Sequence, residues 1–124
     1  MNAIEIGKRL IELTTSDNDA QALEELYADN VVSIEANVGE DAKSDVFNGL
    51  AAVREKHDWW NSVATMHETT AEGPFAGEGE DQFAVRFWMD VTMEEQGRVQ
   101  MAEIGLYTVS DGKIVREIYL PLAT

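Results

Sequence analysis

Apolar residues recur every three or four positions in three early segments, a spacing that places them on one face of an α-helix. The first helix is predicted over residues 2–15, and the polar cluster at residues 15–19 ends it and can cap a second helix. The second helix should end at Asp29-Asn30, before a short strand at residues 31–35. Its apolar face contains Ala22, Leu23, Leu26 and Tyr27. A third helix is predicted from Gly49 to about Val63, with one face formed by Val53, His57 and Trp60.

Beyond the third helix, apolar and polar residues alternate, which is typical of β-strands. Strands are predicted over residues 65–72 and 82–92. A hairpin is predicted over residues 99–120, because Asp111-Gly112 between two apolar runs favours a tight turn. Residues 36–48 are mostly polar, so we expect a loop there with a short strand at residues 45–47.

This order of elements predicts an α+β fold with three N-terminal helices packed on one side of a curved, mostly antiparallel sheet. The chain has 124 residues, of which 44% are hydrophobic, enough for one ordinary core. We therefore expect a single domain over residues 1–124.

One arm of the hairpin carries a charge in an apolar row. Strand side chains alternate between the two faces of a sheet, so one face of this arm holds Val99, Met101, Glu103, Gly105, Tyr107 and Val109. Glu103 is the one charged residue in that row. Burying a carboxylate alone is costly, so Glu103 must be solvated, paired or functional.

The opposite face of the hairpin is also apolar, with Ala102, Ile104, Leu106, Ile114, Ile118 and Leu120. An antiparallel sheet covered on one side alone would present polar residues on the other. We therefore predict a homodimer that buries this outer face, formed by Arg86, Trp88, Ile104, Leu106, Ile118 and Leu120.

The charge balance limits the partners. Nine Lys and Arg against 24 Asp and Glu give a net charge of −15, which repels nucleic acid and anionic lipid. The absence of cysteine excludes thiol chemistry and disulfides. No apolar run approaches a membrane span, and the first residues lack a signal-peptide pattern, so a cytoplasmic protein is expected. With no metal-binding motif and no glycine-rich phosphate loop, we expect neither a metal nor a cofactor.

The residues at 26–31, 49–53 and 107–115 resemble the nuclear-transport-factor-like superfamily. Its members include ketosteroid isomerase, scytalone dehydratase, limonene epoxide hydrolase and the SnoaL-like polyketide cyclases. The runs at 56–60, 72–75 and 82–92 are similar to small stand-alone SnoaL-like proteins. The resemblance implies a cone-shaped fold with an internal cavity, into which Val115, Glu117 and Tyr119 of the last strand would point.

The catalytic residues of the best-known members of this superfamily are mostly absent from the matching positions of this chain. Counting from shared residues places the general base of ketosteroid isomerases at Glu35, but the two oxyanion donors fall on Leu10 and on Gly105 or Ile104, which cannot donate a side-chain hydrogen bond. In epoxide hydrolases a catalytic Asp falls on Tyr119, which is no carboxylate base. Both mechanisms are therefore disfavoured. Scytalone dehydratase uses two histidines and an Asp around a polar cavity. The two histidines of this chain are His57 and His67, and a lone histidine on an apolar face is more often a hydrogen-bonded core residue.

Two function classes remain. The first is a cofactor-free isomerase, cyclase or dehydratase acting on an apolar or aromatic carbonyl compound, with Glu103, Glu35 and His67 as acid–base residues. The second is a non-catalytic ligand-binding or dimerisation module. A strongly raised pKa of Glu103 in a cleft would favour chemistry, and a pair with Lys56 or Arg116 would favour a structural role. In either class, the expected ligand-binding residues are Val53, His57, Trp60, Phe83, Val85, Phe87, Met89, Met101, Tyr107, Glu117 and Tyr119.

Overall fold

The computed structural model describes residues 1–36 and 44–123. The chain begins with two helices, α1 (Ala3–Thr14) and α2 (Asp19–Leu26). A third helix, α3 (Leu50–Val63), follows the first two strands. The strands are β1 (Tyr27–Glu35), β2 (Asp45–Asn48), β3 (Ala64–Ala76), β4 (Gln82–Met93), β5 (Gly97–Ser110) and β6 (Lys113–Leu122). This confirms the predicted α+β class and the order of its elements. The middle of the loop expected at 36–48 lies outside the described residues, and β2 matches the short strand expected at its end.

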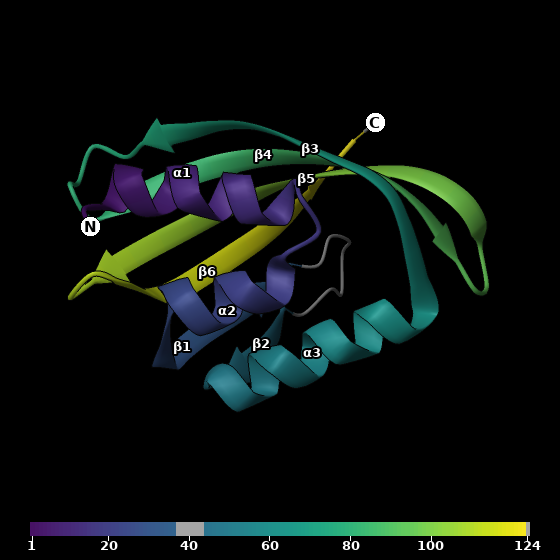
Figure 1. The fold of residues 1–124 in the computed structure, drawn as a ribbon, viewed down its shortest axis with the longest axis horizontal. Helices are drawn as coiled ribbons and strands as arrows, with labels where there is room; N and C mark the ends of the chain where they lie inside the picture. The colour runs from purple at the N-terminus through teal and green to yellow at the C-terminus, as the bar shows by residue number, and fades with distance from the viewer. Residues whose placement is uncertain (37–43, 124) are drawn as a thin grey trace.

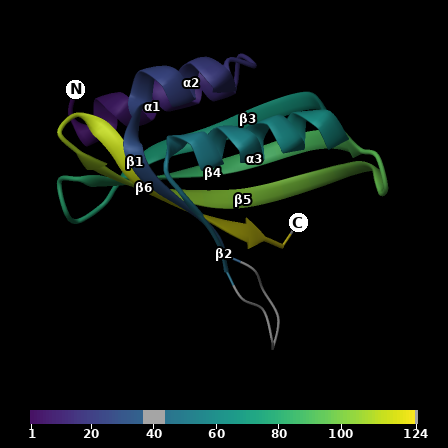
Figure 2. The same cartoon turned by 90° about the horizontal axis from the view of Figure 1, so that it is seen from below.

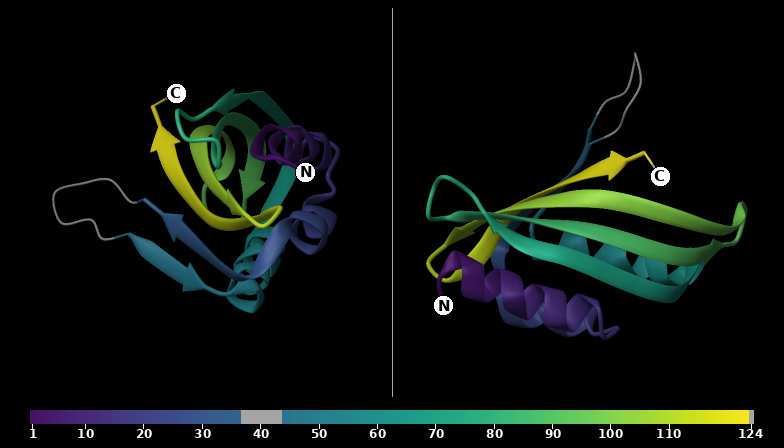
Figure 3. Two further views of the ribbon diagram at one scale, coloured as in Figure 1. Left: turned by 90° about the vertical axis from the view of Figure 1, so that its left-hand side faces the viewer. Right: turned by 90° about the horizontal axis from the view of Figure 1, so that it is seen from above.

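The six strands form one mixed sheet in the order β2-β1-β6-β5-β4-β3 (Figure 1). Neighbouring strands are antiparallel except for β1 and β6, which run parallel. The sheet is strongly curved, and the helices lie along its concave side (Figures 2 and 3). Sequence-distant strands β1 and β6 are thus neighbours, which brings residues near positions 35 and 119 together.

Helix α1 shows how local sequence fixes these elements. The Asn2 side chain accepts a hydrogen bond from the Glu5 backbone N–H at 2.9 Å, and the Glu5 side chain accepts one from the Asn2 backbone N–H at 3.0 Å. This reciprocal pair satisfies two backbone donors that the first turn would otherwise leave unpaired. The apolar stripe of α1 is buried against the sheet through Ile6, Leu10 and Leu13.

Two local predictions are wrong. Tyr27 was expected on the apolar face of the second helix, but its backbone is extended and pairs with Ile114, so α2 ends at Leu26. Ile114 was expected on the outer face, yet it is fully buried. The β5–β6 register shifts between Thr108 and Val109, because Val115 is an extra residue in the ladder. Such a bulge moves the side chains on one side of it to the opposite face of the sheet, so Ile114 points into the core.

The predicted turn of the hairpin is confirmed. Ser110 pairs with Lys113, and the two central residues have positive φ angles, 51° at Asp111 and 74° at Gly112. Two successive positive φ angles define the tight turn whose twist matches that of the flanking strands. No helix among the described residues is long and apolar enough to cross a membrane.

The outer face of the sheet carries an apolar area on β5 and β6. Ile104 pairs with Leu120 and Leu106 pairs with Ile118 across the two strands. Leu106 is 40% exposed and Leu120 is 45% exposed. The homodimer expected from the sequence stays a prediction, and this face is where a second copy would pack.

We expect light scattering at micromolar concentration to give the mass of two chains. Leu106→Asp places a charge at the centre of the outer face and should reduce the measured mass to one chain without lowering the melting temperature of the monomer. Phe75→Asp is a control at another exposed apolar residue, which is 53% exposed on β3. A single-chain mass for the unmodified protein would rule out the dimer.

Candidate functional site

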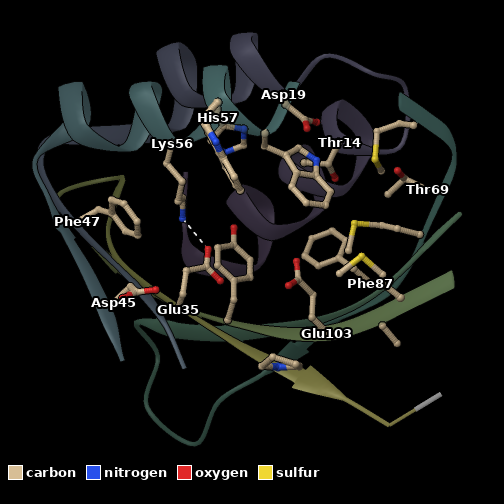
Figure 4. Close-up of a pocket in the computed structure, with 18 of the residues that line it drawn as sticks. Thr14, Asp19, Glu35, Asp45, Phe47, Lys56, His57, Thr69, Phe87 and Glu103 are labelled. Carbon is tan, nitrogen blue, oxygen red and sulfur yellow. Dashed lines mark hydrogen bonds and ion pairs between the residues drawn. The ribbon is translucent and has the colours of Figure 1, made fainter. Parts of the chain in front are cut away.

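A pocket of about 660 Å³ lies between α3 and the concave face of the sheet (Figure 4). Its wall is largely apolar and aromatic, with Phe47, Trp59, Trp60, Phe87, Met89 and Met101. The volume is within the range of about 300–1,000 Å³ typical of small-molecule sites. A few polar side chains interrupt this wall, and their surroundings determine what the pocket can do.

Glu103 reaches the pocket from the middle of β5. Its cross-strand neighbours are Phe87 on β4 and Pro121 on β6, so no adjacent side chain offers a hydrogen bond. Among the described residues, its carboxyl group has no hydrogen-bond or ion-pair partner. Burial raises the pKa of Glu103 to about 7; the charge of Glu35 also raises it, and that of Lys56 lowers it. Glu103 is therefore a carboxyl group that gains and loses a proton near neutral pH.

Lys56 reaches the pocket from α3 on the opposite wall. Its Nζ donates a hydrogen bond to Glu35 at 2.8 Å and another to Ser33 Oγ at 2.7 Å, both residues of β1. The Lys56 side chain is 13% exposed. The pairing of Lys56 that the sequence analysis considered for Glu103 is thus made with Glu35 instead.

A third carboxyl group, that of Glu117, does not line the pocket and has no exposed surface. Ser33 Oγ donates to it at 3.2 Å, and Tyr119 OH donates to its other oxygen at 3.2 Å. Burial raises the pKa of Glu117, while Lys56 and hydrogen bonds from Tyr27, Tyr119 and Ser33 partly oppose that rise.

The tyrosines of this network are held in place by packing. Tyr107 OH lies 3.0 Å from Tyr119 OH, and the Tyr107 ring stacks on Phe83 with 4.8 Å between centroids. Gly105 makes room for Tyr107, because a Cβ atom at position 105 would lie 2.8 Å from the Tyr107 ring and hydroxyl. Burial raises the pKa of both tyrosines well above its usual value, so they remain protonated donors.

Two further groups that line the pocket, His57 and Asp19, have shifted pKa values. Burial and the charge of Lys56 lower the pKa of His57 to about 4, so its imidazole is neutral at pH 7. Asp19, at the start of α2, has a pKa raised to about 6 by burial and by Asp17. Among the described residues, Asp19 Oδ1 is the one buried side-chain oxygen without a hydrogen-bond partner.

Part of the predicted site lines the pocket. Both predicted acid–base carboxylates lie there, as do six predicted ligand-binding residues: His57, Trp60, Phe87, Met89, Met101 and Tyr119. Five others face the same interior but lie in the closed core below the pocket: Val53, Phe83, Val85, Tyr107 and Glu117. The roles assigned to all these residues stay predictions.

His67 is not where the sequence analysis placed it. The β3–β4 register shifts between Met66 and Glu68, so His67 is the extra residue of a bulge. Its side chain is exposed and lies 2.7 Å from Thr92 Oγ1, while Met66 and Thr69 line the pocket instead. Simple alternation along the strand cannot reveal such a bulge.

Sequence reasoning did not assign functions to Lys56 and Asp19. Lys56 lies three residues after Val53 and four before Trp60, so helical spacing placed it on the same face. The orientation of Asp19 depends on how α2 packs, for which the sequence holds no local signal. No group of three or more His, Cys, Asp or Glu among residues 1–36 and 44–123 is arranged to hold a metal ion.

The raised pKa of Glu103 predicts a pH-dependent effect of Glu103→Gln on stability. The folded protein holds this proton up to about pH 7, whereas the unfolded chain releases it near the ordinary value of 4.5. Glu103 therefore lowers the free energy of unfolding progressively as the pH rises from 4.5 to 7. The variant should melt at the same temperature as the wild type at pH 4 and at a higher one at pH 8.

The measurement is a series of thermal melts between pH 4 and pH 8. Glu24→Gln, at an exposed position of α2, controls for the loss of one negative charge from an acidic chain. A difference between Glu103→Gln and wild type that does not grow over this pH range would contradict the raised pKa.

The chain is similar to a known protein family and to several solved structures. Residues 1–120 match the model of the SnoaL-like domain. A crystal structure from Mesorhizobium loti, of a protein proposed to be a SnoaL-like polyketide cyclase, is 41% identical, with a TM-score of 0.84 over 97% of this chain and 99% of that one. A proposed isomerase from Bacillus subtilis is 18% identical, with a TM-score of 0.76 over 97% of this chain and 86% of that one.

A phenazine biosynthesis-related protein from Pseudomonas aeruginosa is 14% identical, with a TM-score of 0.70 over 97% of this chain and 83% of that one. At such low identity, the last two likenesses concern the fold alone. No curated protein matches the chain. The domain match over residues 1–120 and the 41% identity to the Mesorhizobium loti protein show that this chain belongs to the SnoaL-like family.

Proposed function

We propose that the pocket binds a small apolar or aromatic carbonyl compound and that Glu103 moves a proton on it without a cofactor. The observation that carries the proposal is the state of Glu103: a carboxyl group without a partner among the described residues, in an apolar pocket, with a pKa of about 7. The reaction would be of the isomerase, cyclase or lyase type. The proposed cyclase activity of the Mesorhizobium loti relative is consistent with it.

A pKa near 7 suits acid–base catalysis at neutral pH. A general base works best when its pKa lies near the operating pH, because it is then ionised often enough and still basic enough to take a proton. Removal of water from around Glu103 raises its basicity, as burial does for other catalytic carboxylates. A solvated carboxylate at its ordinary pKa would be a much weaker base.

The pocket wall determines which ligands fit. Phe87, Met89 and Met101 line the pocket beside Glu103 on β4 and β5, and Trp60 lines it from α3. Such a surface favours an apolar or aromatic body. A carbonyl group is required for the chemistry, since it acidifies the neighbouring C–H bonds that a carboxylate can then deprotonate.

The proton transfer needs no other reactant. Glu103 takes a proton from the carbon beside the carbonyl group, the C–H bonding pair becomes a C=C bond, and the carbonyl π pair moves onto the oxygen. Where the ligand has a C=C bond next to that carbon, the product is a dienolate, and return of the proton from Glu103 to its far carbon completes an isomerisation. Attack of the enolate carbon on a second carbonyl group of the same ligand closes a ring, and the alkoxide that forms takes the proton from Glu103.

Glu35 has a different role in this proposal from the acid–base role suggested by the sequence. Its carboxylate accepts the hydrogen bond from Lys56 at 2.8 Å, and it is farther along the wall toward Phe47 and Asp45 (Figure 4). We assign Glu35 to holding Lys56. His67, outside the pocket, has no part in the reaction.

Hydrogen–deuterium exchange tests the proposal. We expect the protein to accelerate deuterium incorporation from D2O at the α-carbon of at least one small aromatic ketone, such as 2-tetralone, measured by NMR. The rate should rise with pH up to about 7, because the ionised carboxylate is the base. Glu103→Gln should reduce it by roughly 10²–10⁴-fold.

Glu24→Gln is again the matched control, and it should exchange at the wild-type rate. Unchanged exchange in Glu103→Gln would contradict the role of Glu103. Ketones that bind in the pocket but show no exchange above the buffer rate would instead identify a ligand-binding module without catalysis.

A further inference from the structure

Among residues 1–36 and 44–123, Lys56 finds acceptors for two of its three hydrogen-bond donors. An ammonium group carries three N–H donors. Two of them are taken by Glu35 at 2.8 Å and by Ser33 at 2.7 Å. Among the described residues no acceptor takes the third, although Lys56 lines the pocket.

The surroundings of Lys56 hold its ammonium group in one place. Nζ lies 5.1 Å from the centroid of the Phe47 ring and 5.2 Å from that of Tyr119, on whose electron-rich faces a cation is attracted. The two β1 acceptors fix it from another side. A donor held in advance, in a site with little water, stabilises a developing charge far better than a flexible surface lysine does.

The charge pattern of the pocket directs an oxygen anion to this point. Five carboxyl side chains line the pocket: Asp19, Glu35, Asp45, Glu55 and Glu103. Lys56 is the one cationic side chain among the described lining residues, since His57 is neutral at pH 7. Negative charge on a ligand oxygen is therefore favoured beside Lys56 and disfavoured elsewhere in the pocket.

Lys56 and Glu103 face the same space from opposite walls. Figure 4 shows Lys56 extending from α3 and Glu103 extending from β5 toward the middle of the pocket. The charge of Lys56 acts on Glu103, so the two groups interact across this space. A ligand between them can present its carbonyl oxygen to one group and its α-carbon to the other.

We propose that Lys56 binds the carbonyl oxygen of the ligand through its third N–H and stabilises the negative charge that forms there when Glu103 removes the α-proton. This inference rests on the proposed function, and it adds to the base Glu103 a cation that stabilises the carbonyl oxygen. It also orients the ligand, with the carbonyl group toward α3 and the apolar body toward Phe87 and Met89.

Binding of 2-naphthol and naphthalene tests this role without turnover. The naphtholate oxygen carries the charge of an enolate oxygen, and naphthalene has the same apolar body without it. We expect wild-type protein at pH 8 to bind 2-naphthol at least about tenfold more tightly than naphthalene, as for a hydrogen bond to a charged group. The absorption spectrum of the bound 2-naphthol should shift toward that of its anion.

Lys56→Met should abolish both the preference and the spectral shift while leaving naphthalene affinity unchanged. Lys56→Arg keeps a cation and should retain part of the preference. Lys8→Met, at an exposed position of α1, is the matched control. If Lys56→Met fails to fold because Glu35 loses its partner, the double variant Lys56→Met/Glu35→Gln removes both charges and gives the same readout.

Three outcomes separate the two proposals. Loss of the preference in Lys56→Met supports the role of Lys56. A preference and spectral shift that survive in Lys56→Met overturn it, while the ketone exchange that depends on Glu103 stands. Failure of wild-type protein to bind either aromatic compound overturns both, because the pocket would not accept the class of ligand proposed for it.

Discussion

A carboxyl group with no exposed surface, that of Glu117, determines how the polar side chains around the pocket are arranged. A buried carboxylate must be hydrogen-bonded, or the fold loses several kcal/mol of stability. Its two oxygens receive two short chains of donors, one from Lys56 through Ser33 and the other from Tyr107 through Tyr119. Ser33 and Tyr119 each accept one hydrogen bond and donate the next to Glu117. Lys56 and Tyr119 are thereby fixed at the pocket wall, where the proposed ligand would meet them.

Glu35 and Glu103 line the same pocket in very different surroundings. Glu35 sits at a strand end, where Lys56 offers it an ion pair. Glu103 lies between Phe87 and Pro121, whose side chains have no hydrogen-bonding group and no charge. The same side-chain type therefore holds a lysine in one place and, in the reaction proposed above, carries a proton in the other. This division depends on β1 and β5 being held apart by β6, the strand that carries Glu117.

Residue patterns were sufficient for the fold, because helical periodicity and strand alternation are local properties. They identified all three helices, the hairpin turn at Asp111-Gly112 and Glu103 as the one charge in an apolar row. They failed wherever one extra residue entered a strand: the bulges at His67 and Val115 exchange inside for outside without any change in the apparent pattern. They also could not pair Lys56 with Glu35, since the two residues meet through the packing of α3 on β1.

Gly105 limits the routes by which this pocket can change. The site has no room for a side chain there, because Tyr107 occupies the space that even a methyl group would need. An acidic side chain at position 105 would require Tyr107 to move. That movement would disturb the hydrogen bond between Tyr107 and Tyr119. The ring at position 107 and a side chain at position 105 thus compete for the same space, so a change at either position has to be matched by a change at the other.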